Sequence, residues 1–557
     1  MTLDTIRNTI TRRRFITALA GAASTLIAAC SGPTGFSSGS DEPGDDPTAT
    51  AEGARPSATP AADRLQPTST PERSANTSAS NTQAAGAEST VGPLPEGAVG
   101  RAAPASRPSL PREIYIPFAA VVSRKLQVRD ISLSQLEAVW NLRINNWREL
   151  GDPVSTPVRR YTLPDSALPL EPFGGDIGVQ SIDELAEALW NDRGGIGLIP
   201  VRDVDHRFRT LHVDGVDILR TRGAPNPLML KLFGVPEEIA PESLIRPKSR
   251  AKLTFVGDII FGRYVQVAME ARNDFSAPFR SVADRLKESD LTIGNLECTL
   301  SDNFPQPERE DPKTFRFKTG TVTVSGLKLA DIDYLGRANN HSFDFGPQGM
   351  DDTSRTLDEA GIKHFGMGHN LEEARRPAIA TLGDLSFAFL AYNGISDDYD
   401  GATVDSPGTS PLIEEYVRED VRAAVASGHI VVPFFHWGIE YVALPTDEQR
   451  RFAQIAIDEG ASIVIGSHPH WVQAVETYKG KAIVYSLGNF VFDQAWSRET
   501  TEGVIADLWF EGDKVTGVDL IPILIVEEHR PILLDADSGY HVLERIWTAS
   551  DEVRRWS

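Results

Sequence analysis

Residues 463–470 read Ile-Val-Ile-Gly-Ser-His-Pro-His, an apolar run that ends in two histidines one residue apart. A short run rich in β-branched residues predicts a buried strand. Because the run ends at His468 and His470, we expect two imidazoles at one point in space. Imidazole is a common protein ligand for divalent metals, so the stretch raises the hypothesis of a metal site at a strand end.

Other apolar runs of the C-terminal half end in polar clusters in the same way. These strand-like runs cover 253–257, 291–296, 333–338, 430–435 and 482–490, and the helical candidates between them cover 278–287, 348–360, 415–426 and 446–459. The alternation predicts an α/β domain with ligand groups outside the carboxyl ends of its strands. Taken singly, Asp258 could be a helix N-cap and His436 a packed histidine. The joint pattern favours one composite site.

The residue types in these clusters indicate which metal ions the site would bind. Carboxylates and amides supply hard oxygen ligands and histidines supply nitrogen, a mixture that suits Mn, Fe or Zn better than Ca or Mg alone. Two adjacent ions need a bridging carboxylate, for which Glu297 is the best candidate. Such a pair would hold the nucleophile in line and neutralise charge on a phosphoryl or acyl oxygen.

Six motifs together resemble the CapA family over about residues 250–551. They are Gly257-Asp258, Gly294-Asn295-Leu296-Glu297, the stretch from Asn339 to Gly346, His436-Trp437-Gly438-Ile439-Glu440, Gly466-Ser467-His468-Pro469-His470, and Ser486-Leu487-Gly488-Asn489-Phe490. The resemblance implies an αββα metallophosphoesterase-like sandwich and a part in poly-γ-glutamate capsule synthesis.

The resemblance also implies roles for single residues. The implied metal ligands are Asp258, Glu297, Asn340, His436, His468 and His470. His341 is the implied donor of a proton or hydrogen bond to the reacting oxyanion, and Arg263 could contact an anionic substrate. Asp344 and Glu440 are candidates for orienting the histidines from behind.

One position departs from the pattern of metallophosphoesterases, which place a histidine two residues after the first aspartate. Here that position is Ile260. One metal would therefore lose an imidazole, so that either a second ion binds weakly or another residue replaces the missing ligand.

The sequence of the N-terminal 111 residues predicts an export signal and a tether, not a folded domain. A twin-arginine pattern, Arg12-Arg13-Arg14, precedes a short apolar stretch, and Ile27-Ala28-Ala29-Cys30 resembles a lipobox. We expect a signal peptide over 1–30, with lipidation of Cys30 that anchors the chain on the outer face of the cell membrane. An ordinary cleaved signal is the alternative. Residues 31–111 are rich in Ser, Thr, Ala, Gly and Pro and predict a disordered tether.

Residues 112–245 predict a smaller α/β domain. The stretches 131–151, 194–200 and 211–216 resemble parts of phosphate-binding-type periplasmic solute-binding proteins. The family's phosphate loop should lie near 161–168, but this segment lacks the glycine that lets backbone amides approach an anion. Ligand binding and a purely structural or docking role both remain open for this domain.

The charge composition of the chain limits which classes of molecule it could bind. The chain has 557 residues, with 78 acidic against 55 basic side chains and a net charge of -23. This balance argues against nucleic acid, whose binding depends on neutralising phosphates. Two functional hypotheses follow: an anchored metal-dependent hydrolase, such as a phosphoesterase, and a non-catalytic lipoprotein accessory for export, assembly or retention of an anionic polymer. An anion sensor built on 112–245 is a third and weaker one.

Overall fold

The computed structural model describes residues 112–163, 176–219, 226–235, 249–305, 315–396 and 400–556. The twin-arginine segment, Cys30 and the 31–111 tether lie outside these residues, as do residues 164–168. Within the described part of the chain, no helix combines the length and the apolar character that crossing a bilayer requires.

Residues 112–235 form a mixed sheet around one long strand, β1 (Arg112–Val122). Alternate β1 side chains enter two cores: Phe118 and Ala120 pack with the helix α2, and Ala119 and Val121 pack with the helix α3. The two helices therefore cover opposite faces. The other elements are β3 (Arg159–Thr162), β4 (Ile177–Gly178), β5 (Gly195–Pro200), β6 (Arg209–Thr210), β8 (Met229–Val235), α2 (Leu133–Trp140) and α3 (Ile182–Asn191).

An eight-stranded sheet is the first half of the C-terminal domain. Its order is β14 (Lys363–Phe365), β13 (Tyr334–Gly336), β10 (Leu291–Leu296), β9 (Arg250–Ile259), β24 (Glu502–Glu511), β25 (Lys514–Val526) and β26 (Arg530–Leu533), with β23 (Asn489–Val491) also on β9. β14, β13, β10 and β9 run parallel, so their carboxyl ends lie at one edge.

A six-stranded sheet is the second half. Its order is β16 (Ala378–Leu382), β17 (Leu385–Asn393), β19 (Ile430–His436), β20 (Ile463–Ser467), β22 (Lys481–Val484) and β21 (Val475–Tyr478). β17, β19, β20 and β22 run parallel, as buried, near-continuous apolar strands do in α/β proteins. Short pairs are formed by β2 (Asp130–Ile131) with β7 (His212–Val213), β11 (Thr299–Leu300) with β12 (Lys318–Thr319), and β15 (Met367–Gly368) with β18 (Gly408–Thr409).

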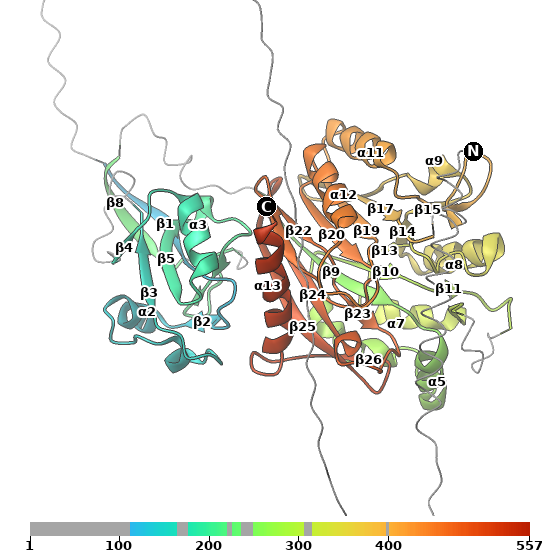
Figure 1. Ribbon diagram of the computed structural model, residues 1–557, viewed down its shortest axis with the longest axis horizontal. Coiled ribbons are helices and arrows are strands. Elements are labelled where there is room, and N and C mark those ends of the chain that lie inside the picture. The colour runs from blue at the N-terminus through green and yellow to red at the C-terminus, as the bar shows by residue number, and fades with distance from the viewer. Residues whose placement is uncertain are drawn as a thin grey trace, which may run out of the picture. The chain divides into compact units, whose positions relative to one another are not determined.

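The two sheets pack face to face, and helices cover their outer faces (Figure 1). The rings of Phe255 on β9 and Phe434 on β19 meet between the sheets, with centroids 5.7 Å apart. The neighbouring Val256 and Phe435 point outward into two separate helix-covered cores. This alternation confirms the predicted αββα sandwich.

The helices divide between the two outer layers. α5 (Arg263–Arg272), α6 (Ala283–Leu286), α7 (Val324–Leu329) and α8 (Gly346–Ala360) accompany the eight-stranded sheet, while α11 (Glu414–Ala426) and α12 (Asp447–Asp458) cover the six-stranded one. α9 (Leu371–Ala374) is a single turn, and α13 (Tyr540–Arg555) packs side chains into the core between the sheets.

Two sequence predictions need correction. The helix expected over 278–287 is interrupted: a 3-10 turn covers Ala277–Phe279 and α6 covers only Ala283–Leu286. The run 482–490, expected as one strand, is two strands in different sheets, β22 and β23. The chain crosses between them at Gly488, whose φ of +70° is readily reached only without a side chain.

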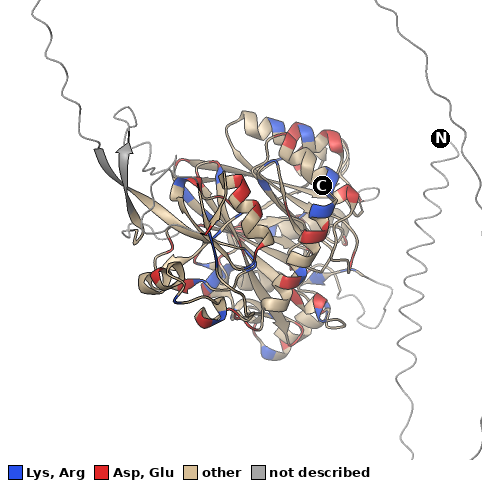
Figure 2. Ribbon diagram, turned by 60° about the vertical axis from the view of Figure 1, so that its left-hand side comes forward, with Lys and Arg blue, Asp and Glu red and all other residues tan. Residues whose placement is uncertain are grey.

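Arg124 joins the N-terminal sheet to the C-terminal domain. Its buried guanidinium donates hydrogen bonds to the carbonyl oxygens of His206, at 2.7 Å, and Val518, and it lies 5.4 Å from the centre of the Trp547 ring. Asp551 on α13 also accepts hydrogen bonds from Lys125 and from the indole of Trp190. Acidic and basic residues are interspersed along the described ribbon (Figure 2), so the excess of negative charge is not gathered on one element.

Candidate metal centre

The six predicted ligands come together where strands of the two sheets end. The eight-stranded sheet places Asp258 near the end of β9, Glu297 directly after β10 and Asn340 after β13, and the six-stranded sheet places His436 at the end of β19 and His468 and His470 after β20. Parallel strands bring such groups to one edge of a sheet. Each sheet therefore contributes half of the cluster.

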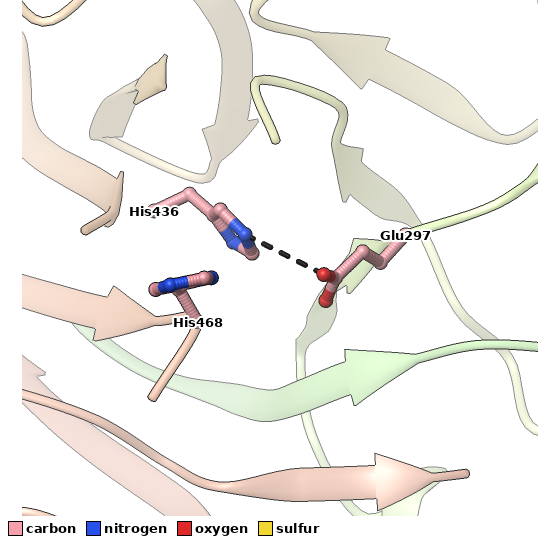
Figure 3. A group of neighbouring side chains, drawn as sticks. All are labelled: Glu297, His436 and His468. Atoms are coloured by element: carbon pink, nitrogen blue, oxygen red, sulfur yellow. Dashed lines mark ion pairs between the residues drawn. The ribbon is translucent and has the colours of Figure 1, made fainter. Parts of the chain in front are cut away.

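Glu297, His436 and His468 form the first group that could hold a cation (Figure 3). Nε2 of His436 lies 3.5 Å from Oε1 of Glu297, and the two imidazole centres are 4.8 Å apart. All three residues are buried. Oε1 of Glu297 and Nδ1 of His468 have no hydrogen-bond partner, which is costly for buried polar atoms. A cation between them would remove this cost, so the residues fit a metal.

Asp258, Glu297 and His470 form a second group, which shares Glu297 with the first. Oδ2 of Asp258 lies 3.3 Å from Nδ1 of His470, which also lies 2.8 Å from the amide oxygen of Asn489. A carboxylate common to two groups is the arrangement expected of a bridging ligand.

The backbone that carries the two histidines is unusual. His468 has a φ of 94° and His470 a φ of 58°, values that side-chain-bearing residues seldom adopt. The amide of His468 donates to Oδ2 of Asp258 at 3.3 Å. This strained loop turns both imidazoles toward the carboxylates, and such strain is common at functional sites.

Burial controls the charges of the cluster. Burial, together with the nearby carboxylates of Asp258 and Glu440, raises the pKa of Glu297 well above its usual value. Burial and the neighbouring histidines lower the pKa values of His436 and His468 well below the usual one. For His470 burial is the largest single effect and opposes the charged form, but the hydrogen bond and charge of Asp258, together with Glu440 and Asn489, outweigh it and raise the pKa. Neutral imidazoles are the form that binds metals.

Amide side chains hold the ligands in place. Asn340 lies with its Oδ1 2.7 Å from Nε2 of His436. Asn295 is part of the 294–297 motif but had no predicted role. Its amide donates to Oδ1 of Asp258 at 2.8 Å and lies 3.3 Å from Nδ1 of His436. Its own oxygen accepts from Asn339 at 2.9 Å. Asn295 thus connects ligands from both sheets, and its place two residues before Glu297 on a buried strand was the available signal.

His341 lies beside the cluster, with Asp344 behind it. Nδ1 of His341 is 3.2 Å from Oδ2 of Asp344. The imidazole also packs against Phe317, with ring centres 4.3 Å apart. Asp344 therefore stands where the sequence predicts a carboxylate that orients a histidine.

Known proteins share this domain. The family described as bacterial capsule synthesis protein PGA_cap matches residues 252–494. The C-terminal domain belongs to the CapA family. Its relatives include the PGA biosynthesis protein CapA of Bacillus subtilis, 34% identical over 255 residues, with 45% of this chain and 66% of that protein covered. The capsule biosynthesis protein CapA of Bacillus anthracis is 29% identical over 329 residues, covering 57% and 79%. The chain thus spans about two thirds of the first relative's length.

Solved structures are similar only in part. A 5'-nucleotidase precursor from Thermus thermophilus has a TM-score of 0.33 and 12% identity, covering 55% of this chain and 59% of that one. An ABC-type phosphate transport receptor from Vibrio cholerae has a TM-score of 0.17 and 15% identity, covering 21% and 55%. Neither likeness bears on function.

Three further positions singled out in the sequence of the CapA-family domain, Ile260, Arg263 and Glu440, lie outside the cluster of six predicted ligands. Ile260 is fully buried in the outer core, so an apolar side chain stands where metallophosphoesterases place a histidine. The guanidinium of Arg263 pairs with the carboxylate of Asp493. Glu440 is exposed beside Tyr441, and its charge acts on His470 only through space.

Proposed function

We propose that the CapA-family domain binds one or two divalent ions, Mn, Fe or Zn, and acts as a metal-dependent hydrolase in poly-γ-glutamate capsule biosynthesis. The observation that carries the proposal is that two buried atoms, Oε1 of Glu297 and Nδ1 of His468, have no hydrogen-bond partner. Both residues belong to the group of Glu297, His436 and His468 that could hold an ion, with Glu297 following a strand of one sheet and His468 a strand of the other. Asp258, Asn340, His436 and His470 complete the ligand set.

The chain's own groups would position a substrate and move a proton. A divalent cation, when bound, neutralises charge that develops on a phosphoryl or acyl oxygen. We assign to His341 the exchange of a proton with that oxygen. Because Nδ1 of His341 is hydrogen-bonded to Asp344, Nε2 is the nitrogen available to the reacting group.

The biological role of the proposal rests on the relatives, whose names assign them to PGA or capsule biosynthesis. We extend that role to this chain, with other components of polymer synthesis as its partners. The sequence supports export by the twin-arginine route and anchoring through Cys30 to the outer face of the membrane. The tether 31–111 would then hold the folded part away from the bilayer.

A non-catalytic accessory for export, assembly or retention of the polymer is the second candidate. Ile260 favours it, because this buried side chain removes one nitrogen ligand from the second ion. An accessory would still bind metal through Glu297, His436 and His468, but it would turn nothing over.

Metal analysis combined with turnover tests the proposal. The purified chain should retain close to stoichiometric Mn, Fe or Zn, and it should hydrolyse a generic phosphodiester or a γ-glutamyl polymer. His341→Ala should keep the metal and lower the rate by about 100-fold or more. His369→Ala is the matched control, because His369 is exposed and pairs with Asp351 and Glu373. A chain without metal would refute the metal proposal, whereas metal without turnover would favour the accessory.

A further inference from the structure

A line of ring contacts leads from the candidate metal centre to the surface. The imidazole of His470 lies 6.1 Å from the ring of Tyr441, and Tyr441 lies 6.1 Å from Trp496 in a T-shaped arrangement. The exposed fraction rises along this line, from 3% at His470 to 36% at Tyr441 and 59% at Trp496. We call Tyr441 and Trp496 the aromatic platform. Exposed apolar surface beside a candidate site marks a place where a ligand packs.

Tyr441 is held rigidly against the metal-site loop. Its φ is 63°, and its amide donates to the carbonyl oxygen of Pro469, between the two histidines, at 2.8 Å. Its hydroxyl accepts a hydrogen bond from Gln494 at 3.2 Å. Because Asn489 contacts both His470 and Gln494, the platform and the metal-site loop are parts of one hydrogen-bonded unit.

The charges around the platform select against anions. Glu440 is exposed next to Tyr441 and presents a carboxylate. Arg263, which the sequence offered as an anion contact, is occupied by Asp493 and lies between the rings of Phe317 and Phe492, 5.0 and 4.9 Å from their centres. The amides of Asn489 and Gln494 are buried and already hydrogen-bonded, so the exposed carboxylate of Glu440 is the acceptor beside the platform that suits hydroxyl groups.

The ring geometry selects against flat aromatic ligands. The planes of Tyr441 and Trp496 are inclined at 79°, so they offer one open face and one edge, not a parallel slot. A nucleobase gains most from stacking between parallel rings. A sugar ring instead presents C–H groups to a single aromatic face and hydroxyls to the side.

We propose that the aromatic platform is a subsite for a neutral saccharide unit beside the candidate metal centre. The C–H face of the sugar packs on the indole of Trp496, and the exposed carboxylate of Glu440 accepts hydrogen bonds from its hydroxyls. This binding does not depend on the proposed metal chemistry, since none of these groups belongs to the ligand set.

Calorimetric titration of the full chain with the β-linked trimer of N-acetylglucosamine tests the subsite. The trimer should bind, and Trp496→Ala should weaken it at least tenfold, whereas Trp496→Phe should retain affinity within about threefold because a flat ring remains. Trp556→Ala is the matched control, since Trp556 is exposed and lies over Arg450 at the end of the chain. Glu297→Gln, which disables the proposed metal centre, should leave trimer binding unchanged.

Three results would overturn the subsite. They are a wild-type chain that does not bind the trimer, a Trp496→Ala chain that binds it as wild type does, and Trp496-dependent binding of adenosine monophosphate or poly-γ-glutamate in place of the sugar. Unchanged melting temperatures of the Trp496 variants would show that a loss of binding is local.

Discussion

Oδ2 of Asp258 lies 3.3 Å from Nδ1 of His470, although Asp258 is on a strand of the eight-stranded sheet and His470 follows a strand of the six-stranded one. Glu297 and His436 bridge the same gap at 3.5 Å. The candidate centre is therefore formed across the sandwich, and its geometry depends on how the two sheets pack. The energetic consequences can be measured one residue at a time.

Removal of metal should destabilise the protein. An ion that binds only the native state adds about 2.7 kcal/mol at one hundred times its dissociation constant. A chelator should therefore lower the Tm of the wild type but leave that of His468→Ala nearly unchanged, as followed by circular dichroism. The His369→Ala chain should respond like the wild type. Equal responses in wild type and His468→Ala would contradict a metal held by His468.

Replacing Asn295 by Ala should cost about 1–3 kcal/mol of unfolding free energy, because Asp258 would keep a buried oxygen without its donor. Urea unfolding measures the change. Asn191→Ala, at the exposed end of α3, is the control and should shift stability by less than about 0.5 kcal/mol. A similarly small effect at Asn295 would show that the amide does not hold the ligands.

Loss of Arg124 should loosen the contact between the N-terminal sheet and the C-terminal domain. Arg124→Ala removes two buried donors and the packing on Trp547, and hydrogen bonds of charged groups contribute about 1.5–3 kcal/mol each. We expect a loss of about 3 kcal/mol, with amide exchange accelerated in β1 and α13. The exposed Arg143→Ala is the control. Unchanged exchange on both sides of the contact would argue that Arg124 is dispensable.

Acid should weaken the same contact through His206. Burial lowers the pKa of His206 from 6.5 to about 3. Between these two pH values the imidazole is therefore protonated in the unfolded chain but neutral in the folded one. The stabilisation is complete above pH 6.5 and falls as the pH drops toward 3, by about 2 kcal/mol between pH 7 and pH 5. His206→Gln, which can still reach Thr477, should lack this part of the acid sensitivity.

Unfolding titrations of wild type and His206→Gln at pH 7 and pH 5 separate this contribution from that of His364, whose pKa burial also lowers to about 3. Parallel losses in the two chains would mean that His206 does not sense the pH.

Local patterns in the sequence predicted an α/β domain and the meeting of its polar clusters at strand ends, whereas the αββα sandwich was implied by the resemblance to the CapA family. Apolar runs give strands, and parallel strands bring their carboxyl ends together. Asn295 escaped assignment because its role is visible only when Asp258 and His436 approach from two sheets. The two strands within 482–490 were also missed, since both halves are equally apolar and only the turn at Gly488 separates them. Neither α5 nor α13 was predicted, although both carry amphipathic patterns.

Each sheet supplies three of the six side chains around the candidate centre. A chain in which only one half has folded therefore presents either three oxygen-bearing residues or three imidazoles, and never the mixed set. The complete ligand set that we propose therefore exists only after the two halves have met. If the proposed ion binds, a low metal content in a purified sample would therefore indicate chains whose two sheets have not packed together.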